Sequence, residues 1–272
     1  MKHEIGISDN CVCNLSDIKV AGFKNVMICE RSTNLETSLQ QAFDLGFNIP
    51  YVHIFSDNSL ANYLWCTGAM NNKVVQNAIN SIKLCNKYGI STVVMHVTCG
   101  DAINLALGPN KYGIESMQKI LEVATANNIC VAIENVDNLN TQHLYYLLDN
   151  IISPYLGYCY DCGHNELYNE NINFMKKYGG RCFAIHIHDN LKDWQLGMDW
   201  TRDLHLLPFD GKIDFEKIMK NIANSSYNGV LMLELQKETI ANPEKYRNFS
   251  VQAYLEEAYK RGEKLLEIFK KL

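Results

Sequence analysis

The stretch that decides the fold is CVAIEN, residues 130–135, an apolar run that ends at a carboxylate and an amide. Its first four residues are apolar and do not alternate with polar ones. Runs of this kind are typical of parallel strands that are covered on both faces. The stretch therefore predicts a buried strand that places Glu134 at its carboxyl end.

Seven further runs of the same kind lie along the chain, before and after this one. Helical patterns alternate with them, as expected for parallel βα units, and 272 residues suit a barrel of about 250. We therefore predict an α/β fold, a single-domain (β/α)8 TIM barrel over residues 1–272; an open doubly wound sheet is the alternative. The other expected strands are 4–8, 26–30, 51–55, 92–97, 156–161, 182–188 and 229–235, and the expected helices are 35–46, 71–89, 113–127, 214–223 and 251–270.

The composition argues against several classes of partner. Lys plus Arg is 25 and Asp plus Glu is 30, which gives a net charge of −5 and no dense basic block. Nucleic acid is therefore not an expected partner. No apolar run approaches the roughly 18 residues that span a bilayer, and the first residues lack a signal-peptide core. We expect a cytoplasmic protein whose ten cysteines are reduced.

Polar residues close six consecutive expected strands. Any one of them could be a helix cap or a hydrogen-bonded surface residue, but this explanation would have to hold independently at every strand. In a barrel, the strand ends converge on one mouth, where enzymes of this fold keep their active sites. Carboxylates mixed with imidazoles suit a divalent cation. The residues are His53, His96, Glu134, Asp161 with His164, His186 with His188, and Glu234.

The segments that carry these residues resemble the xylose-isomerase-like TIM-barrel superfamily. This superfamily includes sugar and sugar-phosphate isomerases and epimerases, and the endonuclease IV group (AP endonuclease family 2). The resemblance runs from roughly residue 50 to residue 236. Its segments are VAIEN (131–135), YDCGH (160–164), IHIHDN (185–190), DLHLLPFDGKIDF (203–215) and VLMLEL (230–235).

The resemblance implies a metal site at the barrel mouth. In the isomerases and epimerases, Glu, Asp, His and Glu from successive strands bind one ion. The third ligand is matched to His186 because Asp189 follows it at the family's spacing, although His188 would face the same side of the strand. Zinc or manganese is favoured, with iron, cobalt and magnesium open. The matching positions in this chain are Glu134, Asp161, His186 and Glu234.

The resemblance also implies two functions that the sequence leaves open. In the first, the protein is an isomerase or epimerase of carbohydrate metabolism, in which Glu134 and Glu234 exchange a proton through a metal-stabilised enediolate. In the second, it is a multimetal phosphodiesterase of the endonuclease IV kind. The additional metal or substrate contacts would be His53, His96, His164, His188, Asp203 and His205.

A third group of functions is kept beside these two: a dehydratase on the same scaffold, or a barrel that binds a ligand without catalysis. A small sugar or sugar phosphate is the expected substrate, but no motif identifies it. No motif gives the oligomeric state, and a homodimer is kept as one option. In the segment 207–215, the helix start could hold a phosphate or a sugar hydroxyl, or could be only a tight turn with an N-cap.

Overall fold

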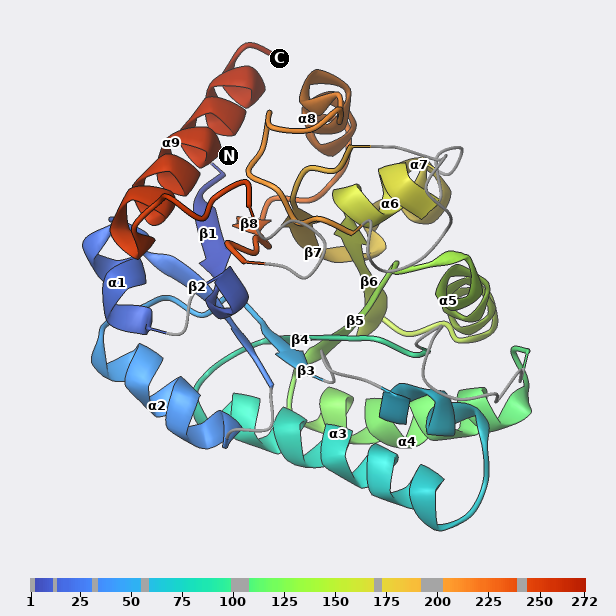
Figure 1. Ribbon diagram of the computed structural model, residues 1–272. Coiled ribbons are helices and arrows are strands. Elements are labelled where there is room, and N and C mark those ends of the chain that lie inside the picture. The colour runs from blue at the N-terminus through green and yellow to red at the C-terminus, as the bar shows by residue number, and fades with distance from the viewer. Residues whose placement is uncertain are drawn as a thin grey trace.

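The computed structural model shows eight parallel strands that close into a barrel in chain order, with β1 paired to β8 (Figure 1). It describes residues 3–11, 14–30, 34–54, 59–98, 108–168, 173–191, 203–238 and 244–272. Every predicted strand is present, with ends that differ by at most two residues. The strands are β1 (Ile5–Ser8), β2 (Asn25–Cys29), β3 (Val52–Ile54), β4 (Thr92–Met95), β5 (Cys130–Glu134), β6 (Leu156–Asp161), β7 (Cys182–Ile187) and β8 (Leu231–Leu233).

Helices surround the barrel (Figure 1). The five predicted helices are present as α2, α3, α4, α8 and α9, and Asp214 caps α8 as predicted. The helices α1, α5, α6 and α7 were not predicted. The helices are α1 (Leu15–Val20), α2 (Leu35–Asp44), α3 (Ala69–Lys87), α4 (Lys111–Ala126), α5 (Asn138–Asn150), α6 (Cys162–Tyr168), α7 (Phe174–Tyr178), α8 (Phe215–Ala223) and α9 (Val251–Lys270), with 3-10 turns η1 (Asp9–Cys11), η2 (Ser59–Trp65) and η3 (Gly179–Arg181).

The apolar core has two layers. The larger one lies between the strands and the helices. The smaller one lies inside the barrel. Within it, the hydroxyl of Tyr51 donates a hydrogen bond of 2.8 Å to the carbonyl of Ile185 and so links the start of β3 to β7 across the barrel. Packed side chains therefore fill the interior of the barrel, which is not an open pore. We call this inner layer the floor, because the mouth lies above it. The buried residues of this floor are Met27, Cys29, Tyr51, Val94, Ala132, Cys159, Ala184 and Met232.

The floor positions the polar residues above it. Side chains of a strand alternate between its two faces, so the residue two places beyond an inward one also points inward. Two places beyond Ala132 stands Glu134, and two places beyond Cys159 stands Asp161. On four other strands, the residue two places beyond a floor residue is also polar. These residues are His53, His96, His186 and Glu234.

Several residues outside this set have packing roles. Cys159 and Cys162, whose spacing is that of redox pairs, are buried and free, as are the other buried cysteines of the described chain. Trp65 is buried and donates its indole N–H to the carbonyl of Val97 at 2.6 Å. Trp194 and Trp200 lie outside the described residues. Among the described helices, none has the length and apolar character needed to cross a bilayer.

Candidate metal centre

Four buried side chains from β5, β6, β7 and the end of β8 converge above the barrel floor. Each contributes one potential ligand atom, and these atoms all lie within 4.8 Å of one another. The sequence predicted these four as the metal ligands, and the structure brings them together. We call them the strand cluster: Glu134, Asp161, His186 and Glu234.

His186 is the centre of the strand cluster. Its side chain is fully buried, and its Nδ1 lies 3.1 Å from Glu234 Oε2 and 3.3 Å from Glu134 Oε1. Asp161 Oδ2 is 3.8 Å away. Nevertheless, neither nitrogen of His186 nor this Asp161 oxygen makes a hydrogen bond within the described chain. Buried polar atoms that face one another without bonding fit a cation that all of them would coordinate.

The electrostatics of the strand cluster also favour a cation. Burial alone would raise the pKa of Glu134, but the surrounding histidines, led by His186, lower it well below its ordinary value. Glu234 behaves similarly: burial would raise its pKa, but His186 and other neighbours lower it to about 2. Burial would lower the pKa of His186, whereas Cys159 and Glu234 help to raise it well above its ordinary value. A proton on His186 thus provides charge that a metal ion would otherwise supply.

Two further predicted residues contact Glu134 from the side of β3 and β4. His53 Nε2 lies 2.7 Å from Glu134 Oε2, and His96 Nε2 lies 3.2 Å from the same oxygen. The two imidazole rings meet edge to face, with centroids 4.9 Å apart. His53, Glu134 and His186 also offer three ligand atoms within 4.8 Å of one another. This side of the mouth therefore has donors for an additional ion or for substrate oxygens.

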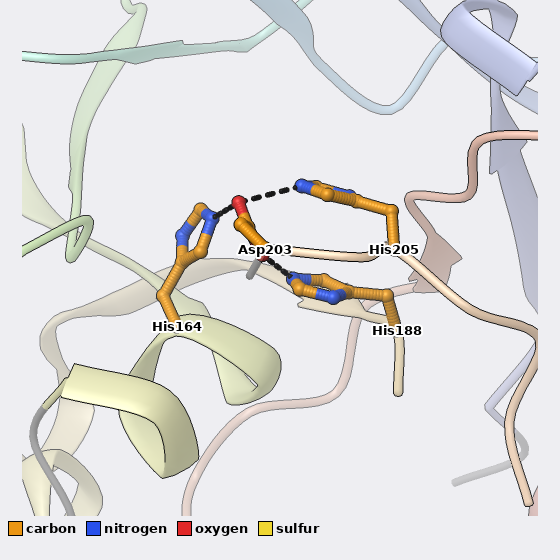
Figure 2. A group of neighbouring side chains, drawn as sticks. All are labelled: His164, His188, Asp203 and His205. Carbon is orange, nitrogen blue, oxygen red and sulfur yellow. Dashed lines mark hydrogen bonds and ion pairs between the residues drawn. The ribbon is translucent and has the colours of Figure 1, made fainter. Parts of the chain in front are cut away.

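A second group of side chains, the loop cluster, lies beside the first. Its members come from α6, from the residue after β7, and from the segment that leads to α8 (Figure 2). Asp203 Oδ2 lies 2.8 Å from His164 Nε2 and 2.9 Å from His205 Nε2. The four potential ligand atoms again lie within 4.8 Å of one another. The loop cluster consists of His164, His188, Asp203 and His205.

Backbone carbonyls orient two of these rings. His164 Nδ1 lies 3.0 Å from the carbonyl of Asn135, and His205 Nδ1 lies 2.7 Å from the carbonyl of Glu234. A carbonyl can only accept, so each Nδ1 carries the proton, and each Nε2 is the free position of the neutral ring. Such carbonyl contacts commonly orient histidines that bind metals.

Asp161 connects the two clusters. Its Oδ1 accepts hydrogen bonds from His188 Nε2 at 3.0 Å and from the backbone N–H of His164 at 2.7 Å. Its Oδ2 faces His186 in the strand cluster. The carboxylate of Asp161 therefore contacts both clusters.

The sequence reasoning missed residues that position the site. Asn135 exchanges two hydrogen bonds of 2.9 Å with the backbone of Asp161, one through each atom of its amide. Asn190 accepts the N–H of Leu204 at 2.7 Å and so fixes the segment that carries Asp203. Each amide directly follows an acid in the quoted motifs, and this adjacency is the only signal that the sequence offers.

Asp189, whose spacing identified His186 as the third ligand, holds a backbone turn and is not itself one of the predicted ligands. Its Oδ2 accepts the N–H of Gly211 at 2.8 Å, and its Oδ1 accepts the N–H of Ile213 at 3.1 Å. A Cβ at Gly211 would lie 2.3 Å from this carboxylate, so the turn requires glycine. The next helix, α8, is capped by Asp214, which accepts the N–H of Lys217. Segment 207–215 is therefore a tight turn followed by a capped helix.

Comparisons with known proteins match most of the chain. A family model for the xylose isomerase-like TIM barrel matches residues 18–257. The chain is 28% identical over 195 residues to the uncharacterized protein y4fM of Sinorhizobium fredii, a match that covers 68% of this chain and 59% of that protein. It is 30% identical over 159 residues to inosose dehydratase of Clostridium botulinum, which covers 52% and 50%. The chain thus spans 59% and 50% of the length of these two curated relatives.

Solved structures share the fold over nearly the whole chain. A D-tagatose 3-epimerase-like protein superimposes with a TM-score of 0.72 at 20% identity and 98% coverage of both chains. An L-ribulose 3-epimerase gives a TM-score of 0.73 at 15% identity and covers 99% and 96% of the two chains. An IolI protein with a bound zinc atom gives 0.72 at 16% identity, with 98% coverage of both.

Proposed function

The chain belongs to the xylose isomerase-like TIM-barrel family, and on that premise we propose that it is a metal-dependent isomerase or epimerase. Its substrate would be a small sugar or sugar phosphate. The observation that carries the proposal is the buried imidazole of His186, which faces three carboxylates without hydrogen bonding to them. The names of the relatives, inosose dehydratase and sugar epimerases, concern reactions of sugar-like compounds and support the same substrate class.

The strand cluster would hold the metal. Its donors are three carboxylate oxygens and one imidazole nitrogen, a set that suits zinc or manganese and also iron, cobalt or magnesium. When bound, the ion would polarise a substrate carbonyl and stabilise the negative charge that develops on its oxygen. The proton transfer itself would be carried out by the protein's own carboxylates.

Glu234 and Glu134 are the proposed proton-transfer pair. Only the Glu234 side chain is noticeably exposed, at 9%, against 1% for Glu134. Glu234 lies near His186 through its Oε2, 3.1 Å from His186 Nδ1. Both oxygens of Glu134 face histidines. Glu234 is therefore the better placed to take a proton from the carbon beside the carbonyl, and Glu134 to return one.

Solvent deuterium exchange tests this proposal across a panel of candidate substrates. Ketopentoses, ketohexoses, their phosphates and inososes would be incubated with protein and Mn²⁺ or Zn²⁺ in heavy water. We expect one of them to gain deuterium beside its carbonyl by NMR and to convert to its isomer or epimer. Exchange followed by loss of water would instead identify a dehydratase, since that reaction begins with the same proton abstraction.

A multimetal phosphodiesterase is the second candidate, because the loop cluster and the His53–His96 pair supply further donors beside the strand cluster. In such enzymes, several ions activate water and bind the leaving oxygen. Cleavage of bis(p-nitrophenyl) phosphate or of DNA with an abasic site, with no exchange in any sugar, would favour this candidate and contradict the isomerase proposal.

A further inference from the structure

We infer that Tyr246, which lies between β8 and α9 and outside both clusters, is a positioning residue for Glu234. Its hydroxyl fixes the turn 207–210, and this turn fixes His205, which holds the backbone at the end of β8. The inference rests on the proposed function, because it assigns Tyr246 to the placement of the proposed base. None of the sequence segments that identify the family contains Tyr246.

The turn 207–210 has a strained backbone. The N–H of Asp210 donates to the carbonyl of Leu207 at 3.1 Å, which closes the turn. Pro208 is its second residue, and Phe209 is its third, with a φ of 73°. Proline followed by a positive φ is the pattern of a type II turn, in which the third residue is normally glycine or asparagine. A phenylalanine keeps such a conformation only where its surroundings fix it.

The hydroxyl of Tyr246 connects the two ends of this turn. It accepts the N–H of Leu207 at 3.1 Å and donates to Asp210 Oδ2 at 2.8 Å. Tyr246 is only 3% exposed, so water has little access to replace either bond. One buried hydroxyl therefore holds the first and the last residue of the turn.

Two side chains of α9 support the same turn from its solvent side. Arg261 donates to the carbonyl of Pro208 at 3.0 Å, and its Nη2 lies 3.2 Å from Asp210 Oδ1. The ammonium of Lys264 lies 3.9 Å from the centre of the Phe209 ring. The Arg261 and Asp210 side chains are 25% and 20% exposed, so solvent weakens their ion pair. The buried hydroxyl of Tyr246 is therefore the contact whose loss should affect the turn most.

His205 connects the segment that contains this turn to the end of β8. Its Nδ1 donates to the carbonyl of Glu234 at 2.7 Å, and its own carbonyl accepts the N–H of Gln236 at 3.1 Å. β8 ends one residue before Glu234, so both bonds lie just beyond the strand. The N–H of Glu234 still pairs with Ile187, but its carbonyl is held by the His205 ring. A shift of His205 would therefore move Glu234.

Strain at two residues would drive such a shift. His205 and Phe209 have φ values of 44° and 73°, both in the left-handed region that residues other than glycine rarely adopt. Leu207, whose N–H is bonded to Tyr246, stands midway between them. Loss of this bond would let the backbone on either side of Leu207 relax toward ordinary dihedral angles.

Hydrogen exchange measured by NMR on the full chain tests this connection without any substrate. Tyr246→Phe removes the hydroxyl and keeps the ring, which packs against Tyr254 with centroids 5.2 Å apart. We expect the amides of Leu207 and Gln236 to exchange at least about fivefold faster, as fits the loss of one buried hydrogen bond. An unchanged rate at Gln236 would overturn the inference, because the end of β8 would then not depend on Tyr246.

Tyr254→Phe is the matched control. The Tyr254 hydroxyl is buried in the same layer but has no hydrogen-bond partner within the described chain. Its removal should leave the exchange rates of Leu207 and Gln236 unchanged. Equal acceleration in the two variants would attribute the effect to a general loosening of α9 and would also overturn the inference.

Turnover of the substrate found with the deuterium-exchange panel, in the presence of Mn²⁺ or Zn²⁺, tests the catalytic consequence. A displacement of about 1 Å at a reacting group can cost about 100-fold in rate. For a smaller shift of Glu234, we expect the kcat of Tyr246→Phe to fall about tenfold while KM stays within about twofold. Tyr254→Phe should keep both values.

The outcomes separate this inference from the proposed function. An unchanged kcat in Tyr246→Phe, with an active wild type, would overturn the inference and leave the proposed function intact. A wild type that is inactive on the whole panel would contradict the proposed function. The exchange rate at Gln236 would then still decide whether Tyr246 positions Glu234.

Discussion

The strand cluster and the loop cluster share a mouth but are built differently. In the first, three of the four side chains are carboxylates, and all four stand on strands or directly after them. In the second, three of the four are imidazoles, and they stand on a helix and on segments that follow β7. Oxygen-rich sets accept many divalent ions, whereas a nitrogen-rich tetrahedral set favours zinc.

This difference in ligand atoms and in supporting elements bears on which cluster would contact the substrate. The strands fix the strand cluster directly above the packed floor, and its most exposed side chain is that of Glu234. The loop cluster joins α6 to the segments of His188 and His205, and an antiparallel bridge between Asp189 and Leu206 connects those two segments. The proposed reaction is therefore placed at the strand cluster, and the following experiments test what each cluster contributes.

The largest effect is expected from Glu234→Gln. Removing a general acid or base costs about 10²–10⁴-fold in rate, so turnover should fall by about a thousandfold. The amide is nearly isosteric, and the far-UV circular dichroism spectrum should not change. The exposed Glu263→Gln is the matched control and should keep full turnover. Full activity in Glu234→Gln would exclude the strand cluster as the reaction centre.

The second effect is a change of the unfolding free energy of the metal-free protein with pH. Burial would lower the pKa of His205, but Asp203 raises it from 6.5 to about 9. The folded state thus holds this proton more tightly than the unfolded chain, and the stabilisation is present below pH 6.5 and lost as pH rises to 9. It amounts to at most about 3 kcal/mol.

Urea unfolding with a chelator present should show this loss between pH 6.5 and 9. Glu234, with a pKa of about 2, should not titrate in that window. The raised pKa values of His164 and His186 act in the same direction as that of His205, so the share of His205 is measured with a variant. His205→Gln should flatten the profile. With zinc present, the trend should weaken or reverse, because metal binding strengthens as its ligands lose protons. A flat profile in the wild type would contradict the protonated His205.

A smaller loss is expected from Gly163→Ala. The added Cβ would lie 2.1 Å from the His188 ring, and overpacking of this kind costs about 1–3 kcal/mol of unfolding free energy. Gly108→Ala is the control, because a Cβ there meets nothing within 4 Å. Equal stability of the two variants would show that His188 can move aside.

The smallest effect is expected from Asp214→Ala, which removes the N-cap of α8 without touching either cluster. Loss of such a cap costs about 1 kcal/mol, whereas Asp214→Asn should keep it. Both variants should bind as much metal as the wild type. A change in metal content would show that the turn held by Asp189 transmits strain to the loop cluster.

The sequence predicted the barrel well because all eight strands are apolar on both faces, and a polar residue on six of them marks the mouth. It could not assign His188 to a cluster, because facing the same side as His186 does not decide which carboxylates it meets. Helix α6 was missed because Gly163, His164 and Asn165 interrupt any apolar periodicity.

The roles of Asn135 and Asn190 were beyond prediction for a different reason. Their amides bond to the backbone of residues 26 and 14 positions away, and such partners are defined only after the barrel closes. The same holds for Gly163, whose lack of a side chain matters only because the ring of His188 covers it.

Asp161, with one oxygen directed to each cluster, would make the binding of ions interdependent if each cluster held one. Two ions on either side of one carboxylate compete for its electron density and share its orientation. By thermodynamic reciprocity, the factor by which the first ion changes the affinity of the second equals the factor in the opposite direction. The metal content of such a protein is therefore a cooperative quantity, and a titration at one site reports on the other.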